Sequence, residues 1–341
     1  MFTVSEPSAD QWDAFVSQQP RAHALQYAAW GALKSAYGWS HARVALAGAD
    51  GALAAGAQLL FRALPLRLGT LAYLPMGPYV TAPAHWPALW GAVHAAAHQR
   101  RAAFLKWEPG LSLGTPPPDP AACGFAPSAQ TIQPPRTIVL DIAADDDAIL
   151  ARMNQGTRRK IRQSLKNGVR YYEGTAADVA TFTAMIQTTG ARGAFGVHAP
   201  GYYRLAYDLF VPAGRAALIL ADHEGDPLAG VMVFAAGDTA WYLYGASSDI
   251  KRGLLAAYGV QWAAIQWARA RGCRWYDLWG VPDADEAALE AQFQSRSDGM
   301  WGVYGFKRGW GGRVVRSAGA WDYVYNPLVY TLYRAALRLP G

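Results

Sequence analysis

The sequence predicts an α/β protein made of two similar lobes, each built on a mixed sheet. Three observations lead to this prediction. The chain has 341 residues, which exceeds the length of one typical domain. About half of the residues are hydrophobic and 16% are charged, as expected for a chain with a large packed core. The same succession of hairpin, strand, helix and strand also occurs twice at matched spacing.

Turn residues and hydrophobic periodicity define the two copies. In each copy two strands flank a polar turn, a third strand follows, and a helix leads to a last strand. The turn and the last strand are 53 residues apart in the first copy (Gly51 to Phe104) and 50 in the second (Gly225 to Trp275). The predicted elements are strands 42–47, 52–62 and 71–74, helix 84–101 and strand 104–108, then strands 217–221, 228–235 and 241–244, helix 254–271 and strand 275–279.

Proline-rich stretches at 114–120 and 133–135 separate the two copies and are expected to be surface loops. A strand is predicted over 137–142. The acidic run 145–147 then opens a helix, because carboxylates favour the positive end of the helix dipole. We therefore expect the first lobe to span residues 1–143 and the second lobe residues 144–316.

Composition restricts the class of protein. Cys123 and Cys273 lack the spacing of a disulfide framework or a metal site, so no metal is expected. The N-terminus does not resemble a signal peptide and no apolar stretch is long enough to span a membrane, so we expect a cytoplasmic protein. The net charge of +6 and the isoelectric point near 9.3 favour an anionic partner such as nucleic acid, a phosphate or a membrane surface.

A helix predicted over 148–168 is strongly basic, with six cations and no acid between Thr157 and Arg170. Like charges four residues apart repel by about 0.2–0.5 kcal/mol per pair, and a bound anion would offset that repulsion. The helix is therefore either a solvated face or a contact surface for RNA phosphates or a pyrophosphate. The residues expected in that contact are Arg158, Arg159, Lys160 and Arg162, and those expected on the buried face are Ile149, Met153, Thr157, Ile161 and Leu165.

Six glycines between Gly299 and Gly312 are interspersed with aromatic residues. Glycine permits unusual backbone angles and close approach to a ligand, so we expect a glycine-framed turn at 305–309. At its centre the dipeptide Phe306-Lys307 places an ammonium group among apolar side chains. Such a lysine is a desolvated, reactive group or a donor to negative charge that develops in a reaction, or it extends past the aromatic side chains to solvent.

Six short motifs occur in order between Gln26 and Gly309: Gln26-Tyr-Ala-Ala-Trp30 with Lys34 and Gly38-Trp39, Tyr73-Leu-Pro-Met-Gly-Pro78, Arg158-Arg-Lys-Ile-Arg162, Tyr242-Leu-Tyr-Gly-Ala-Ser247, Tyr276-Asp-Leu-Trp-Gly280 and Gly305-Phe-Lys-Arg-Gly309. Together they resemble the FemABX family, the peptidoglycan interpeptide-bridge aminoacyltransferases. The resemblance implies two acetyltransferase-like lobes that face a cleft, with residues 317–341 completing the first lobe. The chain resembles the short members, because it has no heptad pattern for the long helical-hairpin arm of larger ones.

The family transfers an amino acid from aminoacyl-tRNA to a side-chain amine in the stem peptide of a peptidoglycan precursor, and the resemblance implies this activity here. Glycine, alanine and serine are all compatible as the transferred amino acid. The acceptor is UDP-MurNAc-pentapeptide or lipid II. Aminoacyl-tRNA serves as co-substrate and no cofactor is expected. Peripheral contact with the inner face of the plasma membrane is a further expectation.

The resemblance also assigns roles to residues. Lys307 would stabilise the oxyanion of the tetrahedral intermediate or the terminal ribose of the tRNA, and the backbone carbonyl of Phe306 would polarise the attacking amine. His198 departs from members that have an arginine before the residue matching Tyr202. Neutral histidine is a weaker phosphate anchor, and a packing role for it stays open. The residues expected to bind the precursor are Lys34, Trp39, Tyr73, His198, Tyr202, Tyr242 and Tyr244.

Two other functions stay open. An acyl-CoA-dependent acetyltransferase needs small residues at a helix start, where backbone amides reach the pyrophosphate. The matching segment here, Lys251-Arg-Gly-Leu-Leu-Ala-Ala257, has one glycine followed by two leucines. A non-enzymatic protein that binds RNA or a membrane surface would account for the basic helix but not for the segment around Lys307. Asp277, at the end of a predicted strand, is interpreted as a residue that caps a loop.

Overall fold

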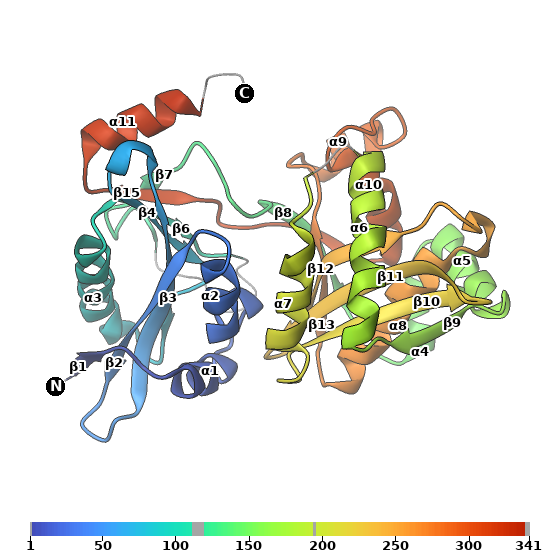
Figure 1. Cartoon of the computed structure of the whole chain (residues 1–341), viewed down its shortest axis with the longest axis horizontal. Coiled ribbons are helices and arrows are strands. Elements are labelled where there is room, and N and C mark those ends of the chain that lie inside the picture. Colours follow the sequence, from blue (N-terminus) through green and yellow to red (C-terminus); the bar gives the residue numbers. More distant parts are fainter. Residues whose placement is uncertain (1, 111–118, 194–195, 338–341) are drawn as a thin grey trace. The chain divides into compact units, whose positions relative to one another are not determined.

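A computed structural model describes residues 2–110, 119–193 and 196–337. Its contacts divide the chain into two compact units, shown in Figure 1. Unit 1 runs to Gln133 and resumes at Ser317, and unit 2 runs from Pro134 to Arg316. Of the first proline-rich stretch, residues 114–118 lie outside the described residues.

Unit 1 is a mixed sheet with helices on both faces. Its elements are β1 (Thr3–Ser5), α1 (Ala9–Ser17), α2 (Ala28–Ser35), β2 (Ser40–Ala47), β3 (Leu53–Ala63), β4 (Thr70–Pro75), β5 (Tyr79–Val80), α3 (Trp86–Gln99), β6 (Ala102–Glu108), β7 (Ala126–Pro127), β15 (Trp321–Val324) and α11 (Pro327–Ala336). The strand order is β1-β2-β3-β4-β6-β15-β7, and β5 pairs with β3. Only the β4–β6 pair is parallel among these described strands. The helix α3 packs on β2, β3 and β6, and α2 packs on β2 and β3.

Unit 2 has the same kind of mixed sheet. Its elements are β8 (Arg136–Asp141), α4 (Asp146–Arg152), α5 (Gln155–Lys166), β9 (Arg170–Glu173), α6 (Val179–Gly193), α7 (Pro200–Phe210), β10 (Ala216–His223), β11 (Asp226–Ala236), β12 (Thr239–Ser247), α8 (Ala256–Ala270), β13 (Trp275–Gly280), α9 (Glu286–Gln292), α10 (Trp301–Lys307) and β14 (Arg313–Arg316). The strand order is β14-β8-β13-β12-β11-β10-β9. The helix α8 packs on β10 and β11 and against α5, while α6 and α7 pack on each other and on β12 and β10.

The two sheets correspond strand by strand, which confirms the duplicated fold that the sequence predicts. The order β1-β2-β3-β4-β6-β15-β7 in unit 1 matches β9-β10-β11-β12-β13-β8-β14 in unit 2. In both units a helix, α3 or α8, connects the two parallel strands. The sixth position is filled by a strand from outside the repeated pattern: β15 comes from the C-terminal segment, and β8 precedes the other strands of unit 2.

The division between the units lies ten residues before the expected boundary at 143. The reason is strand β8, which pairs with β13 through Leu140 and Tyr276 and therefore belongs to the second sheet. The C-terminal segment belongs to unit 1, where β15 pairs with β6. A buried ion pair of 2.8 Å between Lys106 and Asp322 lies within this strand pair.

The helix predicted over 148–168 is in fact two helices, α4 and α5. The backbone of Met153 is extended, and the side chain of Asn154 accepts a hydrogen bond from the Thr157 amide (2.7 Å), which caps a new helix. The break changes which residues face inward. Ile161 is buried as expected, but Leu165 is 49% exposed, so the prediction of Leu165 as a core residue was wrong.

The glycine-rich segment is helical rather than a turn. Helix α10 runs to Lys307, and a 3-10 turn covers the next three residues. Within the segment only Gly299 and Gly311 have the left-handed backbone that favours glycine. Gly309 is needed for another reason: a Cβ atom there would lie 2.2 Å from the Thr157 hydroxyl oxygen. Gly309 therefore lets the 3-10 turn that follows α10 pack closely against α5.

In the described part of the chain the longest helices, α6 and α8, have 15 residues each. These residues therefore contain no long helical-hairpin arm. Within the same ranges no helix combines the length and apolar character that crossing a bilayer requires.

Candidate active site

Two parallel strands of unit 2 separate toward their carboxyl ends. The strands β12 and β13 pair from Thr239 and Trp275 up to Trp241 and Asp277, and both then continue beyond the last pair. The corresponding strands β4 and β6 of unit 1 stay paired to the end of β4. Ligands of open α/β sheets bind in crevices beyond the carboxyl ends of the strands. The separation makes unit 2 the place to look for the reaction site.

Lys307 places its ammonium group at this point. Its side chain is 7% exposed, and Nζ donates hydrogen bonds to the carbonyl oxygens of Gly280 (2.7 Å) and Trp279 (3.3 Å). The centroid of the Tyr242 ring lies 5.7 Å from Nζ. Burial lowers the pKa of Lys307 to about 8, and nearby Asp277 opposes this shift. The group therefore stays mostly protonated at neutral pH and keeps one N–H for a ligand.

Asp277 fixes the segment to which Lys307 is bound. Its buried carboxylate accepts hydrogen bonds from the Thr137 hydroxyl and from the Trp279 amide (2.6 Å). Trp279 has a left-handed backbone, φ 60°, which bulky residues rarely adopt. Burial raises the pKa of Asp277 to about 6, although its two hydrogen bonds act in the other direction. These contacts agree with the loop-capping role interpreted from the sequence.

Tyr242 and Tyr244, which the resemblance places together in precursor binding, lie on opposite faces of the sheet. The register of β11 and β12 shifts between them, so Val233 pairs with Tyr242 and Met232 with Tyr244. The extra residue, Leu243, forms a bulge that interrupts the normal alternation of side chains. Tyr242 packs against the core that includes α8, whereas Tyr244 joins the side chains of α7.

His198 and Tyr202 gather around Tyr244. The hydroxyl oxygens of Tyr202 and Tyr244 are 3.1 Å apart. The His198 ring stacks on Tyr202 with 3.8 Å between centroids, and its amide donates to the Tyr203 hydroxyl. The structure thus unites three of the predicted binding residues, on the face of the sheet opposite Tyr242. These contacts also supply the packing role that was left open for His198.

Phe306 belongs to an aromatic cluster with Tyr258 and Trp310. In the sequence, the helical spacing of Tyr258 indicates only that it lies on the apolar face of its helix. The Phe306 ring lies 5.0 Å from Tyr258 and 5.7 Å from Trp310, between centroids. The Tyr258 hydroxyl accepts a hydrogen bond of 3.0 Å from Lys160 Nζ, so this cluster joins α5 to α10. The buried Trp310 Nε1 has no hydrogen-bond partner among the described residues. The role of the Phe306 carbonyl stays a prediction.

The cations of the basic region are not equivalent. Arg158 donates hydrogen bonds to the carbonyl oxygens of Ala151 (2.9 Å) and Met153 (3.1 Å), and so caps the end of α4. Arg170, just beyond α5, is held by the carboxylate of Asp222 through two hydrogen bonds. A structural role therefore accounts for both arginines.

Arg159 and Arg162 are exposed on the outer face of α5. They border a surface hollow of about 590 Å³, and no acidic residue lines it. A concave cationic surface of this kind suits a phosphate-rich ligand. The lining residues are Gln155, Arg158, Arg159, Arg162, Gln163, Lys166 and Asn167.

In unit 1, Lys34 and Trp39 lie close to a second cation. Lys34 Nζ lies 4.7 Å from the ring centroid of Trp30, and the guanidinium carbon of Arg62 lies 5.5 Å from that of Trp39. Burial, followed by the charge of Arg62, lowers the pKa of Lys34 to about 8. The half-buried Trp39 and the two cations form a site that could hold an anionic, ring-containing group.

Tyr73 has a buried position. Its hydroxyl donates to the carboxylate of Glu108 and accepts from Gln133 Nε2 (3.1 Å). Its ring lies 6.2 Å from the ring of Trp39. Burial, together with the charge of Glu108, raises the pKa of Tyr73 well above its usual value. Tyr73 therefore supports Trp39 from the interior, and a direct contact with precursor is not favoured by this geometry.

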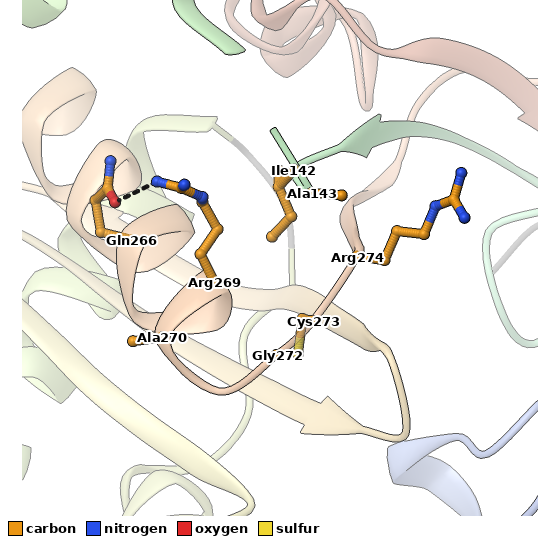
Figure 2. Close-up of a pocket in the computed structure, with 8 residues that line it drawn as sticks. All are labelled: Ile142, Ala143, Gln266, Arg269, Ala270, Gly272, Cys273 and Arg274. Carbon is orange, nitrogen blue, oxygen red and sulfur yellow. Dashed lines mark hydrogen bonds between the residues drawn. The ribbon is translucent and has the colours of Figure 1, made fainter. Parts of the chain in front are cut away.

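A second hollow of unit 2, of about 460 Å³, lies at the opposite end of β13 from Lys307 (Figure 2). Arg269 projects beside it and donates to Gln266 Oε1 at 3.1 Å and to Asp146. The guanidinium of Arg269 is already paired with Asp146, and the hollow lies at the far end of β13 from Lys307. We therefore do not assign this hollow to the reaction site. The lining residues are Ile142, Ala143, Gln266, Arg269, Ala270, Gly272, Cys273 and Arg274.

Two alternative kinds of site find little support in the described residues. These residues contain no group of three or more His, Cys, Asp or Glu side chains that could hold a metal ion. At the segment that matches a pyrophosphate-binding loop, Lys251 is engaged by Glu224 (3.0 Å) and Asp226 (2.9 Å). The bulky Leu255 takes a left-handed backbone directly before α8.

Comparison with known proteins accounts for this architecture. The model of the FemAB family matches residues 8–116, 123–225 and 217–338. A protein of Staphylococcus saprophyticus named lipid II:glycine glycyltransferase is 27% identical over 397 aligned positions, which cover 94% of this chain and 92% of the relative. The alignment is longer than this chain, so the relative carries residues within the match that this chain lacks.

Solved structures support the same assignment. The crystal structure of FemX superimposes with a TM-score of 0.85 and 25% identity, covering 97% of this chain and 99% of that one. A tandem GNAT protein from clavulanic acid biosynthesis has a TM-score of 0.55 and 14% identity, over 96% and 99% of the two chains, which shows the shared fold alone. Together with the family match over nearly the whole chain, these findings show that the protein is an aminoacyltransferase and belongs to the FemAB family.

Proposed function

We propose that this aminoacyltransferase transfers a small amino acid from aminoacyl-tRNA to the side-chain amine of a stem peptide in a lipid-linked peptidoglycan precursor. The observation that carries the proposal is the buried Lys307 ammonium, held by neutral carbonyl groups where β12 and β13 separate. The names of the relatives, lipid II:glycine glycyltransferases, support a lipid-linked acceptor and favour glycine as the transferred amino acid.

In the proposed reaction the neutral amine attacks the ester carbonyl carbon that links the amino acid to the tRNA ribose. A carbon–nitrogen bond forms, and the carbonyl oxygen becomes an oxyanion to which the free N–H of Lys307 donates. The ester carbon–oxygen bond then breaks. The proton lost by the amine finally resides on the departing ribose oxygen, so that the products are an amide and uncharged tRNA.

The basic face of α5 supports tRNA as the donor. Arg159 and Arg162 line a cationic hollow, and Lys160 on the same helix connects to Phe306 through Tyr258. The phosphates of an RNA strand would occupy the hollow, and its terminal nucleotide would lie near the Phe306–Tyr258 cluster, since aromatic rings stack on unpaired bases.

Lys34 and Trp39 are the proposed anchor for the precursor. The Lys34 ammonium is mostly protonated at neutral pH, and Arg62 adds a second positive charge beside Trp39. This pair of cations suits the diphosphate of a precursor, with Trp39 against its sugar.

The test is a transfer assay with a panel of charged tRNAs against lipid II and UDP-MurNAc-pentapeptide. We expect glycyl-tRNA with lipid II to give the highest kcat/KM. Lys307→Met should lower kcat by about 10²–10³-fold, the usual effect of losing an oxyanion donor, with its thermal unfolding temperature maintained. Arg170→Gln serves as the matched control, because Asp222 already engages that cation. Acetyl-CoA-dependent transfer, or full activity of Lys307→Met, would contradict the proposal.

A further inference from the structure

One end of unit 1 exposes leucine side chains from two segments that are far apart in the sequence. In the turn between β3 and β4, Leu66 is 89% exposed, and on α11 Leu328 is 72% exposed. Leu68 and Leu332 are exposed beside them. The outer face of a surface helix is ordinarily polar, but α11 presents leucine outward and packs tyrosine inward. These residues are called the leucine surface below; it consists of Leu66, Leu68, Leu328 and Leu332.

Both segments rest on one small core. Leu64 from the turn and Tyr330 and Tyr333 from α11 pack against the buried side chains of Phe104 and Val329. Figure 1 shows α11 next to the turn between β3 and β4. The exposed leucines of the two segments therefore lie at the same end of unit 1.

The turn holds Leu66 outward by its backbone. Leu66 and Arg67 have φ values of 55° and 58°, in a region that L residues usually avoid and that costs free energy. The turn is closed by a hydrogen bond of 2.9 Å from the Leu64 amide to the Gly69 carbonyl. A strained backbone that presents a fully exposed leucine points to a functional surface rather than to packing.

Arginines surround the leucine surface, and acids are missing from these segments. Arg67 belongs to the turn and Arg62 to the end of β3 that leads into it. Arg100 and Arg101 lie beside the turn, because the Thr70 amide donates to the Arg101 carbonyl (3.0 Å). All four arginines are exposed. The sequence has no Asp or Glu between residues 51 and 107 or between 326 and 337.

Helix α11 contacts an acidic side chain, Asp322, whose charge is neutralised by Lys106. Asp322, which accepts a hydrogen bond of 2.8 Å from the Tyr330 hydroxyl, is buried and paired with Lys106. Arg334 adds a further exposed cation on α11 itself. The whole end of the unit is thus apolar at its centre and positive at its margin.

We infer that the leucine surface docks unit 1 onto an anionic lipid bilayer. Leucine side chains enter the boundary between headgroups and acyl chains, while the arginines contact the phosphates of the headgroups. A protein partner would need its own acids to match the arginines, whereas an anionic bilayer supplies apolar and negative groups together.

This inference deepens the proposed function, in which the acceptor is lipid-linked. Trp39 packs against the same small core as Leu64, and Arg62 lies over its ring. A precursor held at Lys34 and Trp39 would therefore have its hydrocarbon chain beside the docked bilayer. Docking through the leucine surface would therefore bring unit 1 to a substrate that is anchored in the membrane.

The test is co-sedimentation of the full chain with vesicles of phosphatidylglycerol and phosphatidylcholine, or of phosphatidylcholine alone. We expect the combined variant Leu66→Asn, Leu328→Gln, Leu332→Gln to lower the partition coefficient on mixed vesicles by about tenfold or more. Asparagine is used at 66 because it tolerates the left-handed backbone. Arg67→Gln should lower binding about fivefold, on anionic vesicles only. The control is Ile250→Gln, an exposed apolar residue of unit 2, which should bind as the unmodified chain does.

Equal binding by the combined variant, or an equal loss with Ile250→Gln, would overturn the inference. So would a dimer that the combined variant converts to a monomer in sedimentation velocity, because the surface would then cover a second copy. An assay of transfer to the soluble nucleotide-linked precursor distinguishes a failure of the docking inference from a failure of the proposed function. We expect this transfer to be unchanged in the combined variant, so vesicle binding and aminoacyl transfer can each fail without the other.

Discussion

Lys307 and Gly280 are joined by a hydrogen bond of 2.7 Å from the ammonium group to the carbonyl oxygen. The bond holds a buried cation at the carboxyl end of β13, beside the point where β12 and β13 part. Both direct acceptors of Lys307 are carbonyl groups rather than carboxylates. The positive charge is therefore oriented without being neutralised by a bonded partner, which is the property that oxyanion stabilisation requires.

The first prediction concerns pH and follows from the pKa of Lys307, which burial lowers to about 8. Above that pH the ammonium loses its proton, so the single-turnover rate should fall by about tenfold per pH unit. Lys307→Arg keeps its charge to much higher pH, and its residual activity should lack this decline. Rapid-quench measurement on preformed complexes avoids interference from ester hydrolysis. If Lys307→Arg showed the same decline in rate, the decline would arise from the titration of a group other than Lys307.

The second prediction concerns Asp277, whose pKa rises from 3.8 to about 6 on burial. The folded chain thus binds this proton more tightly than the unfolded chain. The stability gained is present below about pH 4 and is lost as pH rises through 6. Asp277→Asn cannot ionise, so urea unfolding from pH 4 to pH 7 should show the unmodified chain losing stability relative to the variant. A constant difference across this range would contradict the pKa shift.

Asp277→Asn has a second expected effect, on Lys307. The charge of Asp277 raises the pKa of Lys307, so its removal should shift the alkaline decline in rate to lower pH. The side-chain amide of the variant still offers a carbonyl oxygen to the two hydrogen bonds that Asp277 accepts. A purely structural role would lower activity without moving the pH profile.

The third prediction concerns tRNA binding by α5. Removing two of the exposed cations with Arg159→Gln and Arg162→Gln should reduce the slope of log affinity against log salt by about 0.7–0.9 for each lost phosphate contact. Filter binding of tRNA over a series of salt concentrations measures this slope. Arg170→Gln is the control, because Asp222 binds that guanidinium, and it should leave the slope unchanged. A slope that falls equally in the control would indicate a diffuse charge effect.

The fourth prediction concerns the packing of the 3-10 turn after α10 (Arg308–Trp310) against α5. Alanine at Gly309 would place Cβ 2.2 Å from the Thr157 hydroxyl oxygen and 2.8 Å from Asn154 Nδ2. We expect Gly309→Ala to lower the free energy of unfolding by about 1–3 kcal/mol. At Gly305 a Cβ would meet only Phe293, at 4.0 Å, so Gly305→Ala should raise it by about 0.5–1 kcal/mol. Urea unfolding of both variants checks the contrast, and equal effects would contradict it.

The duplicated fold could be predicted from the sequence because its signals are local. Turn residues and alternating apolar residues mark each hairpin, and the matched spacing of the two copies is visible without any tertiary information. The placement of β8 and β15 could not be predicted in this way. Each joins a sheet through pairing with a strand distant in the sequence, such as Tyr323 with Leu105, and no local pattern specifies that partner.

Motifs in the sequence indicated the elements of the site but not the arrangement of its side chains. A single bulged residue, Leu243, sends Tyr242 and Tyr244 to opposite faces. The charge of the basic region was overestimated for a similar reason. Arg170 is neutralised by Asp222, 52 residues further along the chain, and only the fold brings them together. The Tyr258–Trp310 contact likewise depends on how α8 packs against the 3-10 turn that follows α10.

The strand β15 has a consequence for the order of folding during synthesis. It lies inside the first sheet, between β6 and β7, yet it is translated after all of unit 2. Until those last residues leave the ribosome, the edge of β6 has no partner strand and the charge of Lys106 has no Asp322 to meet it. The sheet of unit 1 is thus completed only after unit 2 has been translated, and during that interval the open edge of β6 is a site at which the nascent chain can aggregate.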